Sequence, residues 1–486
     1  MKKHLTRRSF LQKTLSIGGT TLMASLLPSG QAFFSTGKLR SEAMSERNIL
    51  LLISDDHGID QTGCYGNTII QTPNIDRLAD EGVRFTHAFT TAASCSPSRS
   101  SLLTGLYPHQ NGQYGLAHRQ HHFSMFDWVE TMPTLLKRAK YRTGLIGKLH
   151  VEPHSLFHFD YEISSEEIME NRDVSKMAEK AGEFFRQKTQ QPFFLLIGYS
   201  DPHRLKRKDF GNKQTYPGIV PRSYDPGDVI VPDFLPDIPE VREELADMYE
   251  SITRLDTGVG MVLKELQNSG QYESTLILYL SDNGIPFPGA KTNLYDAGVR
   301  VPLIIRFPGV KRRYVSAAVI SFIDLLPTVL EWTGVSRPEY PLPGRSFLSI
   351  LDERNPQGWD EVYFSHSFHQ VTMNYPMRAL RTSRYKYILN LFPELEFPGA
   401  SDLIASKTWQ GIVDRKLEWM GARRVETYLK RPKEELYDIE RDPHEVNNLS
   451  TDSHSSEILI ELRNRLTKMR TNTDDPWLEV EDYQSH

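Results

Sequence analysis

The chain has 486 residues, of which 39% are hydrophobic and 24% charged, and its formal net charge is −5 at pH 7. This length and composition indicate a globular protein with one large domain and room for a smaller one. The negative charge argues against bulk electrostatic binding of nucleic acid, so an anionic ligand would need a local cluster of positive groups. Two cysteines allow at most one disulfide and exclude zinc sites built on several thiolates.

The N-terminus combines a basic start with a modest apolar stretch. Residues 6–11, TRRSFL, are similar to a twin-arginine export signal, and the apolar region after them is too short and too polar to predict a membrane span. A general secretory signal or an amphipathic helix is the alternative. We expect residues 1–32 to be a twin-arginine export signal and the mature protein to be periplasmic or secreted, without stable membrane insertion.

Short apolar runs alternate with helical patterns in the first two thirds of the chain. Runs of strand length lie at 47–56, 141–150, 191–203, 274–284 and 299–309. Apolar residues at helical spacing predict helices over 72–85 and 243–269. Continuous apolar strands that alternate with helices predict an α/β domain with a large, mostly parallel central sheet covered by helices.

The pattern changes beyond about residue 355. Residues 379–391 alternate like a half-exposed strand, 434–449 are rich in turn formers, and 457–470 have the spacing of a final amphipathic helix. We interpret residues 45–354 as the main domain and 355–486 as a smaller C-terminal α+β subdomain.

Acidic residues directly follow two of the predicted strands, at the sheet edge where open α/β proteins bind ligands. Asp55 and Asp56 end the first strand, and Asp282 and Asn283 follow a later one. Neighbouring buried carboxylates repel each other and need a cation between them, and hard oxygen ligands suit calcium or magnesium. The alternative is that these residues are ordinary caps and turns, which Asp and Asn often form.

Basic residues and one cysteine occupy comparable positions. Candidates at or just past strand ends are Lys148, His150, His203 and Lys291. Each of these alone, like Arg99, is more often a solvated surface residue. Cys95 lies in CSPSRSSLLTG at the expected start of a helix, whereas Cys64 in GCYG has no charged neighbours in the sequence and is interpreted as a packing residue.

The segment CSPSRSSLLTG resembles the C-x-P-x-R signature of the sulfatase family, whose cysteine is converted to formylglycine after translation. The other candidates follow in the family's order. The resemblance implies that one calcium ion is bound by Asp55, Asp56, Asp282, Asn283 and the formylglycine at Cys95, and that the sulfate is surrounded by Arg99, Lys148, His150, His203 and Lys291. It also implies an alkaline-phosphatase-like fold, with residues 45–354 as the catalytic domain.

The resemblance further implies a role for each group. Hydrated formylglycine attacks sulfur and forms a covalent sulfate ester, which then collapses to release sulfate. Arg99 is expected to hold the diol, and two lysines to neutralise sulfate oxygens as charge develops. His150 is the candidate base for the collapse, and His203 the candidate acid for the leaving group.

Several further segments resemble the sulfamidase branch of the family. They are HHFSMFD (121–127), SDNGIPFP (281–288), HQVTMNYPMRAL (369–380) and RDPHEVNNL (441–449). They imply hydrolysis of the N-sulfate of terminal N-sulfoglucosamine in heparin or heparan sulfate. Two features depart from that branch: Lys291 stands where it usually has arginine, and residues 204–214 differ from its pattern. An O-sulfatase acting on another sulfated glycan is therefore the alternative.

The implied partners are a sulfated saccharide and the maturation enzyme that generates formylglycine; no nucleic acid is expected, and a homo-oligomer stays open. A phosphatase or phosphonate hydrolase of the same fold is a rival interpretation, but such enzymes use Ser or Thr and typically a zinc pair with more histidine ligands. A glycan-binding protein without activity would have lost Cys95, Arg99 or a lysine, and none is lost.

Overall fold

The computed structural model describes residues 47–118, 120–206, 209–309 and 313–484, so the expected export signal at 1–32 lies outside the described residues. In the described part of the chain, no helix is long and apolar enough to cross a membrane. The two larger sheets described below belong to one compact unit. A domain boundary near residue 355 stays a prediction.

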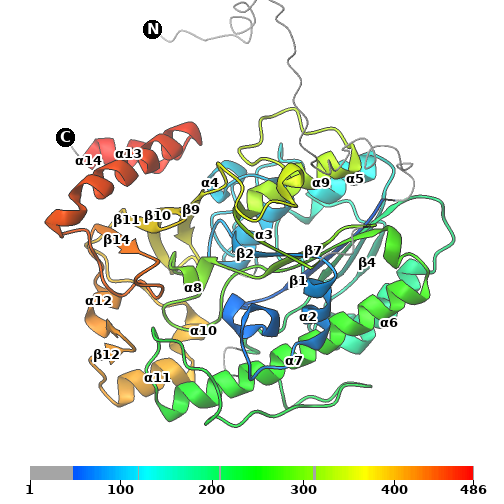
Figure 1. Cartoon of the computed structure of the whole chain (residues 1–486), viewed down its shortest axis with the longest axis horizontal. Helices are drawn as coiled ribbons and strands as arrows, with labels where there is room; N and C mark the ends of the chain where they lie inside the picture. Colours follow the sequence, from blue (N-terminus) through cyan, green and yellow to red (C-terminus); the bar gives the residue numbers. More distant parts are fainter. Residues whose placement is uncertain (1–46, 119, 207–208, 310–312, 485–486) are drawn as a thin grey trace, which may run out of the picture. The chain divides into compact units, whose positions relative to one another are not determined.

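An eight-stranded sheet forms the centre of this unit (Figure 1). Its strands are β1 (Asn48–Ser54), β2 (Val83–Phe89), β3 (Arg142–Gly147), β4 (Tyr161–Ile163), β5 (Phe193–Gly198), β6 (Thr275–Ser281), β7 (Leu303–Arg306) and β8 (Tyr314–Ser321). In the order β4-β3-β5-β1-β6-β7-β2-β8, only β7 runs antiparallel to its neighbours. β1 is buried along its whole length between β5 and β6. The predicted mostly parallel sheet is confirmed.

Helices cover both faces of this sheet. They include α2 (Pro73–Asp80), α3 (Cys95–Thr104), α5 (Met132–Arg138), α6 (Val174–Phe185), α7 (Pro239–Asn268) and α9 (Leu325–Thr333). Successive side chains of a strand point to opposite faces. Leu51 of β1 therefore packs with residues of α3, α5 and α9, whereas Leu50 and Leu52 pack with residues of α2, α6 and α7. Figure 1 shows these two sets of helices on opposite sides of the sheet.

Strand β2 lies where the sequence predicts the end of a helix. α2 ends at Asp80, and Gly82 lies so close to β7 that a Cβ atom there would be 2.4 Å from the carbonyl oxygen of Ile305. Glycine is needed at this approach, and from Val83 the chain pairs with both β7 and β8. The prediction of a helix over 72–85 is therefore wrong for its last residues.

The C-terminal residues form a four-stranded antiparallel sheet in the order β14-β11-β10-β9. Its strands are β9 (Glu361–Phe368), β10 (Asn374–Thr382), β11 (Tyr385–Asn390) and β14 (Glu434–Asp438). Residues 379–391, expected as one half-exposed strand, are instead the end of β10, a turn and the whole of β11. β10 is buried along most of its length because α13 (Ser456–Asn472) covers one face of the sheet and the region of β2 and β8 packs on the other.

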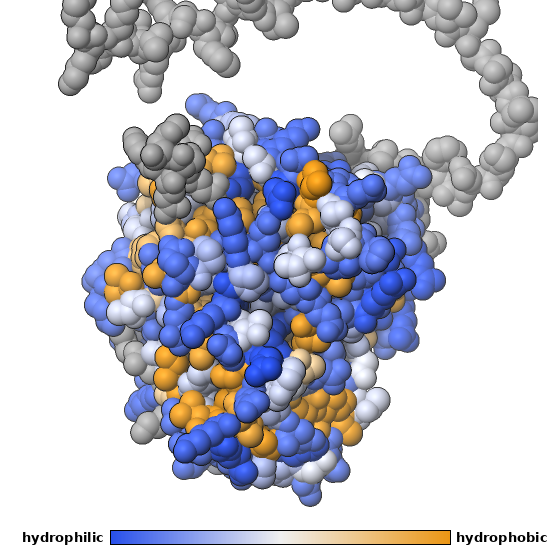
Figure 2. All heavy atoms as spheres, turned by 90° about the vertical axis from the view of Figure 1, so that its left-hand side faces the viewer, coloured by the Kyte–Doolittle hydropathy of each residue, from blue (hydrophilic) through white to orange (hydrophobic). Residues whose placement is uncertain are grey.

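The remaining elements are short or terminal. They are α4 (Pro108–Asn111), α8 (Asp296–Val299), α10 (Ser401–Ile404), α11 (Lys407–Asp414), β12 (Trp419–Met420), β13 (Arg423–Arg424), α12 (Val425–Leu429) and α14 (Trp477–Gln484). Figure 2 shows the face on the side of the small sheet, which is mostly hydrophilic, with hydrophobic spheres more frequent toward its lower end. Together, the large sheet with its helices and the small sheet with α13 confirm the predicted fold class.

Candidate active site

The acidic residues predicted as metal ligands lie side by side because of strand register. Ser54 of β1 pairs with Ser281 of β6, so the residues that follow the two strands meet at one sheet edge. The backbone N–H of Asp56 donates to Asp282 Oδ1 at 3.1 Å, and Asn283 Nδ2 donates to Asp56 Oδ1 at 2.6 Å. These side chains are fully buried.

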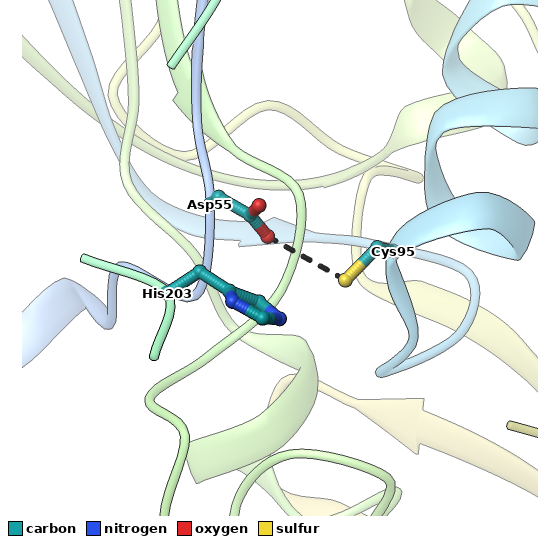
Figure 3. Close-up of side chains that lie close together, drawn as sticks. All are labelled: Asp55, Cys95 and His203. Atoms are coloured by element: carbon teal, nitrogen blue, oxygen red, sulfur yellow. Dashed lines mark hydrogen bonds between the residues drawn. The ribbon is translucent and has the colours of Figure 1, made fainter. Parts of the chain in front are cut away.

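Cys95 is the first residue of α3 and faces these carboxylates. Its Sγ lies 3.5 Å from Asp55 Oδ1, and His203 approaches the same point from the loop after β5 (Figure 3). Burial raises the pKa of the Cys95 thiol, so the unmodified thiol is protonated and a poor nucleophile. Cys64 is partly buried beside the core, as expected for a packing residue, although Asp76 lies next to it and accepts its backbone N–H at 2.7 Å.

Three cations hold the carboxylates in place. Arg99 Nε donates to Asp282 Oδ2 at 2.8 Å, and its Nη1 donates to the backbone oxygen of Lys148 at 2.9 Å. The ammonium of Lys148 pairs with Asp55. Lys291 Nζ contacts Asp56 Oδ2 at 2.8 Å and also Asp402 Oδ2 at 2.9 Å.

The donor set fits one divalent cation. Burial, with repulsion from Asp55, raises the pKa of Asp282 to about 7, and burial raises that of Asp56 to about 6 despite the nearby Lys291. Burial opposes ionisation of Asp55 as well, but Lys148 together with His203, Arg99 and Lys291 outweighs it and holds the pKa of Asp55 well below the usual range.

The positions of the oxygens agree with this charge pattern. Ligand atoms of Asp55, Asp56, Cys95 and Asp282 all lie within 4.8 Å of one another. Asn283 Oδ1 is buried and, among the described residues, has no hydrogen-bond partner. A set of carboxylate and amide oxygens is what calcium and magnesium bind in proteins. The five predicted ligands are therefore brought together.

The two predicted histidines, His150 and His203, both line the cavity that contains Cys95. His203 Nδ1 lies 2.7 Å from the backbone oxygen of Arg204, so the neutral ring carries its proton there and turns Nε2 toward Asp56 Oδ2, 3.8 Å away. Burial and the nearby Lys291 lower the pKa of His203 to about 3. Burial, with Lys148, also holds the pKa of His150 well below its usual range.

The cavity above Cys95 contains further residues that were not named individually from the sequence. It has a volume of about 290 Å³ and is lined by Cys95, Leu116, His118, His150, His203, Arg204, Lys206, His369, Gln370, Ser401 and Asp402. His118 Nδ1 lies 2.5 Å from His150 Nε2, and His369 Nδ1 lies 2.9 Å from Ser94 Oγ. His369 and Gln370 begin the segment HQVTMNYPMRAL, which could have pointed to them. Asp402 follows no strand, and nothing in the sequence marks it.

Comparisons with known proteins agree with this geometry. Residues 47–335 match the family model described as sulfatase, and residues 290–398 match the one described as N-sulphoglucosamine sulphohydrolase, C-terminal. The chain belongs to the sulfatase family. It is 40% identical to human N-sulphoglucosamine sulphohydrolase over 461 residues, covering 89% of this chain and 91% of that protein. It is also 30% identical to an ulvan-active sulfatase of Formosa agariphila, covering 85% of this chain and 78% of that one.

Solved structures share the fold. A protein in complex with D-glucosamine-2-N,6-O-disulfate has a TM-score of 0.66 at 21% identity, covering 88% of this chain and 98% of that chain. The phosphonate monoester hydrolase of Agrobacterium radiobacter has a TM-score of 0.64 at 18% identity, covering 88% and 96%. Because a phosphonate hydrolase shares the fold, the fold alone does not select the reaction. The match to the sulfatase family selects the reaction: this protein is a hydrolase of sulfate esters or sulfamates.

Proposed function

We propose that this sulfatase hydrolyses the N-sulfate of terminal N-sulfoglucosamine in heparin or heparan sulfate. The observation that carries the proposal is the 40% identity to human N-sulphoglucosamine sulphohydrolase over most of both chains. The match of residues 290–398 to the C-terminal model of the same enzymes supports it, since this segment includes the cavity residues His369 and Gln370. An O-sulfatase acting on another sulfated glycan is the second candidate, supported by the similarity to an ulvan-active sulfatase.

We infer that Cys95 is matured to formylglycine by a dedicated enzyme and that one calcium ion is bound beside it. The raised pKa of the buried thiol supports the first inference, because an unmodified thiol would attack sulfur poorly. The crowded carboxylates and the unpartnered Asn283 oxygen support the second. Formylglycine at residue 95 would supply the attacking oxygen, and a bound calcium ion would polarise the sulfate.

The chain's own side chains would position sulfate and move protons. Lys148 and Lys291 place two ammonium groups at the carboxylate cluster, where they can neutralise sulfate oxygens as charge builds up. Arg99 ties α3 to Asp282 and to the backbone of Lys148, which fixes the start of the helix and residue 95 against the cluster. His203 turns Nε2 into the site and is neutral in the free enzyme, so it would take up a proton when the anionic substrate enters and would donate it to the leaving nitrogen. His150 would act as the base.

We also propose export through residues 1–32 to the periplasm or the cell exterior, on the strength of the TRRSFL segment. Blocking the twin-arginine route in the native host should retain the protein inside the cell with this segment uncleaved.

The test of substrate is sulfate release by protein produced together with a formylglycine-generating enzyme and supplied with calcium. The panel contains N-sulfoglucosamine and its 3-O- and 6-O-sulfated isomers. Release from the N-sulfated sugar is expected. Release from an O-sulfated sugar alone would overturn the substrate proposal and leave the sulfatase family membership intact.

A further inference from the structure

Asp402 is a buried carboxylate that reaches the cavity from the C-terminal region. It lies on α10, is 5% exposed, and lines the cavity together with Cys95 and His203. Its Oδ2 accepts from Lys291 Nζ at 2.9 Å, whereas its Oδ1 is buried and has no hydrogen-bond partner in the part of the chain that the structure describes. An unpaired buried acceptor costs free energy, and a hydrogen-bond donor on a ligand would remove this cost by pairing with Oδ1.

The backbone around Asp402 is held on both sides. The N–H of Ser401 donates to Gln370 Oε1 at 3.2 Å, and Gln370 Nε2 donates back to Ser401 Oγ at 2.6 Å. Beyond α10, the N–H of Lys407 donates to Glu244 of α7 at 2.9 Å. The carboxylate is thus fixed before a ligand arrives, as a recognition group requires.

The need to neutralise the charge of Lys291 does not by itself explain why a carboxylate is buried at position 402. Lys291 already has Asp56 as a buried partner at 2.8 Å, and this second contact uses only one oxygen of Asp402. Ligand atoms of Asp402, Asp56 and His203 lie within 4.8 Å of one another. The carboxylate with the unpaired oxygen therefore lies beside His203, the proposed acid for the leaving group.

We propose that Asp402 recognises the N–H of the sulfamate and so selects N-sulfated over O-sulfated sugars. This inference rests on the proposed function. A sulfamate nitrogen carries one hydrogen and one lone pair, so it can donate to Asp402 Oδ1 while its lone pair faces His203. A sulfate ester has an oxygen at this position, which carries only lone pairs and would face the carboxylate unfavourably. Discrimination by a buried hydrogen-bonding group is stronger than discrimination by shape alone.

The experiment compares N-sulfoglucosamine with its N-methyl derivative, which has no N–H, and with 6-O-sulfoglucosamine. The wild type, Asp402→Ala and Asp402→Asn are measured, with Asp414→Asn as the matched control because Asp414 is an exposed acid on the adjacent α11. Thermal unfolding shows which variants fold, and Asp402→Asn keeps the side-chain size if the alanine variant does not.

Loss of a hydrogen bond to a charged group should lower kcat/KM of the wild type on the N-methyl sugar by about 10- to 100-fold. Asp402→Ala should lower kcat/KM on N-sulfoglucosamine by a similar factor. The kcat/KM of this variant should be only slightly lower on the N-methyl sugar than on N-sulfoglucosamine, and its activity on the 6-O-sulfate should be unchanged or higher. Asp414→Asn should match the wild type. Equal losses on all three sugars would overturn the inference, because Asp402 would then act only through Lys291. A wild type that releases sulfate from the O-sulfated sugar alone would overturn the proposed function and this inference with it, and that outcome is visible without any variant.

Discussion

Two groups of buried charges in this protein are built differently. In the C-terminal region, Arg378 on β10 and Asp475 after α13 form a two-bond pair, with Nε–Oδ2 at 2.7 Å and Nη2–Oδ1 at 2.9 Å, and both side chains are fully buried. At the edge of the large sheet, four buried carboxylates face three cations. There, Asn283 and Asp402 each keep an oxygen without a partner among the described residues.

The difference separates a group whose charged partners all come from the fold from one in which two oxygens have no partner among the described residues. Burial acts to raise the pKa of Asp475, but Arg378 together with His109 and Arg470 outweighs it and holds that pKa below the usual range. Burial and Asp55 instead raise the pKa of Asp282 to about 7. Asp282 has other carboxylates beside it, whereas the charged groups that act on Asp475 are cations, so the neighbouring charges decide the direction of each pKa shift. Carboxylates with raised pKa values beside the cavity-lining Cys95 mark the cluster at the sheet edge as the candidate functional site.

Removal of the group at position 95 should have the largest effect on activity. Cys95→Ala should lower kcat at least ~10⁴-fold, as expected for loss of a nucleophile. The midpoint of thermal unfolding should change little, because only one small side-chain atom is lost. Sulfate release and differential scanning fluorimetry measure the two effects, with Cys64→Ala as the control that keeps activity. Near-normal turnover by Cys95→Ala would contradict the assignment.

Alanine at one carboxylate in each group should separate function from stability. If calcium binds as proposed, Asp282→Ala should lose calcium binding and about 10³-fold in kcat, since the ion would stabilise charge in the transition state. Asp475→Ala should lower the free energy of unfolding by about 3–5 kcal/mol, because the buried Arg378 and Arg470 both lose the carboxylate that they contact. Its activity per folded molecule should stay near that of the wild type. Urea unfolding and calorimetric calcium titration distinguish the two. The reverse pattern would mean that the two groups have been confused.

The sequence predicted much of the site because of one geometric rule. Asp55 and Asp282 directly follow parallel strands, and parallel strands end at the same sheet edge, so local patterns were enough to place them together. Asp402 and the Arg378–Asp475 pair depend on how the C-terminal region docks, which no local spacing encodes. Similarly, the helix expected through residue 85 ends early because Gly82 meets β7, a contact more than 200 residues distant in sequence.

The affinity of the acidic cluster at the edge of the large sheet for calcium should depend on pH. The pKa values of Asp282 and Asp56, about 7 and about 6, lie above the ordinary 3.8, so the metal-free site binds protons that calcium must displace. Affinity should therefore rise with pH, by up to about tenfold per unit between pH 6 and 7 for each competing proton. Calorimetric titrations at pH 6, 7 and 8 test this, and Asp282→Asn should flatten the dependence. An affinity that does not change over this range would argue against the assigned ligands.

The smallest effect is expected from Lys291→Arg, which makes the charge cluster at the edge of the large sheet more similar to the Arg378–Asp475 pair. A guanidinium keeps the buried charge and can contact Asp56 and Asp402 with separate N–H groups, so kcat/KM on N-sulfoglucosamine should fall less than about threefold. Lys291→Ala should lose about 10²-fold or more, because two buried carboxylates then lack their cation. Steady-state kinetics on N- and 6-O-sulfated glucosamine measure both. If the new arginine instead formed a two-bond pair with Asp402, as Arg378 does with Asp475, it would occupy Oδ1 and the preference for the N-sulfate would disappear. Retained preference with arginine, and lost activity with alanine, would show that position 291 supplies charge while Asp402 supplies the recognition.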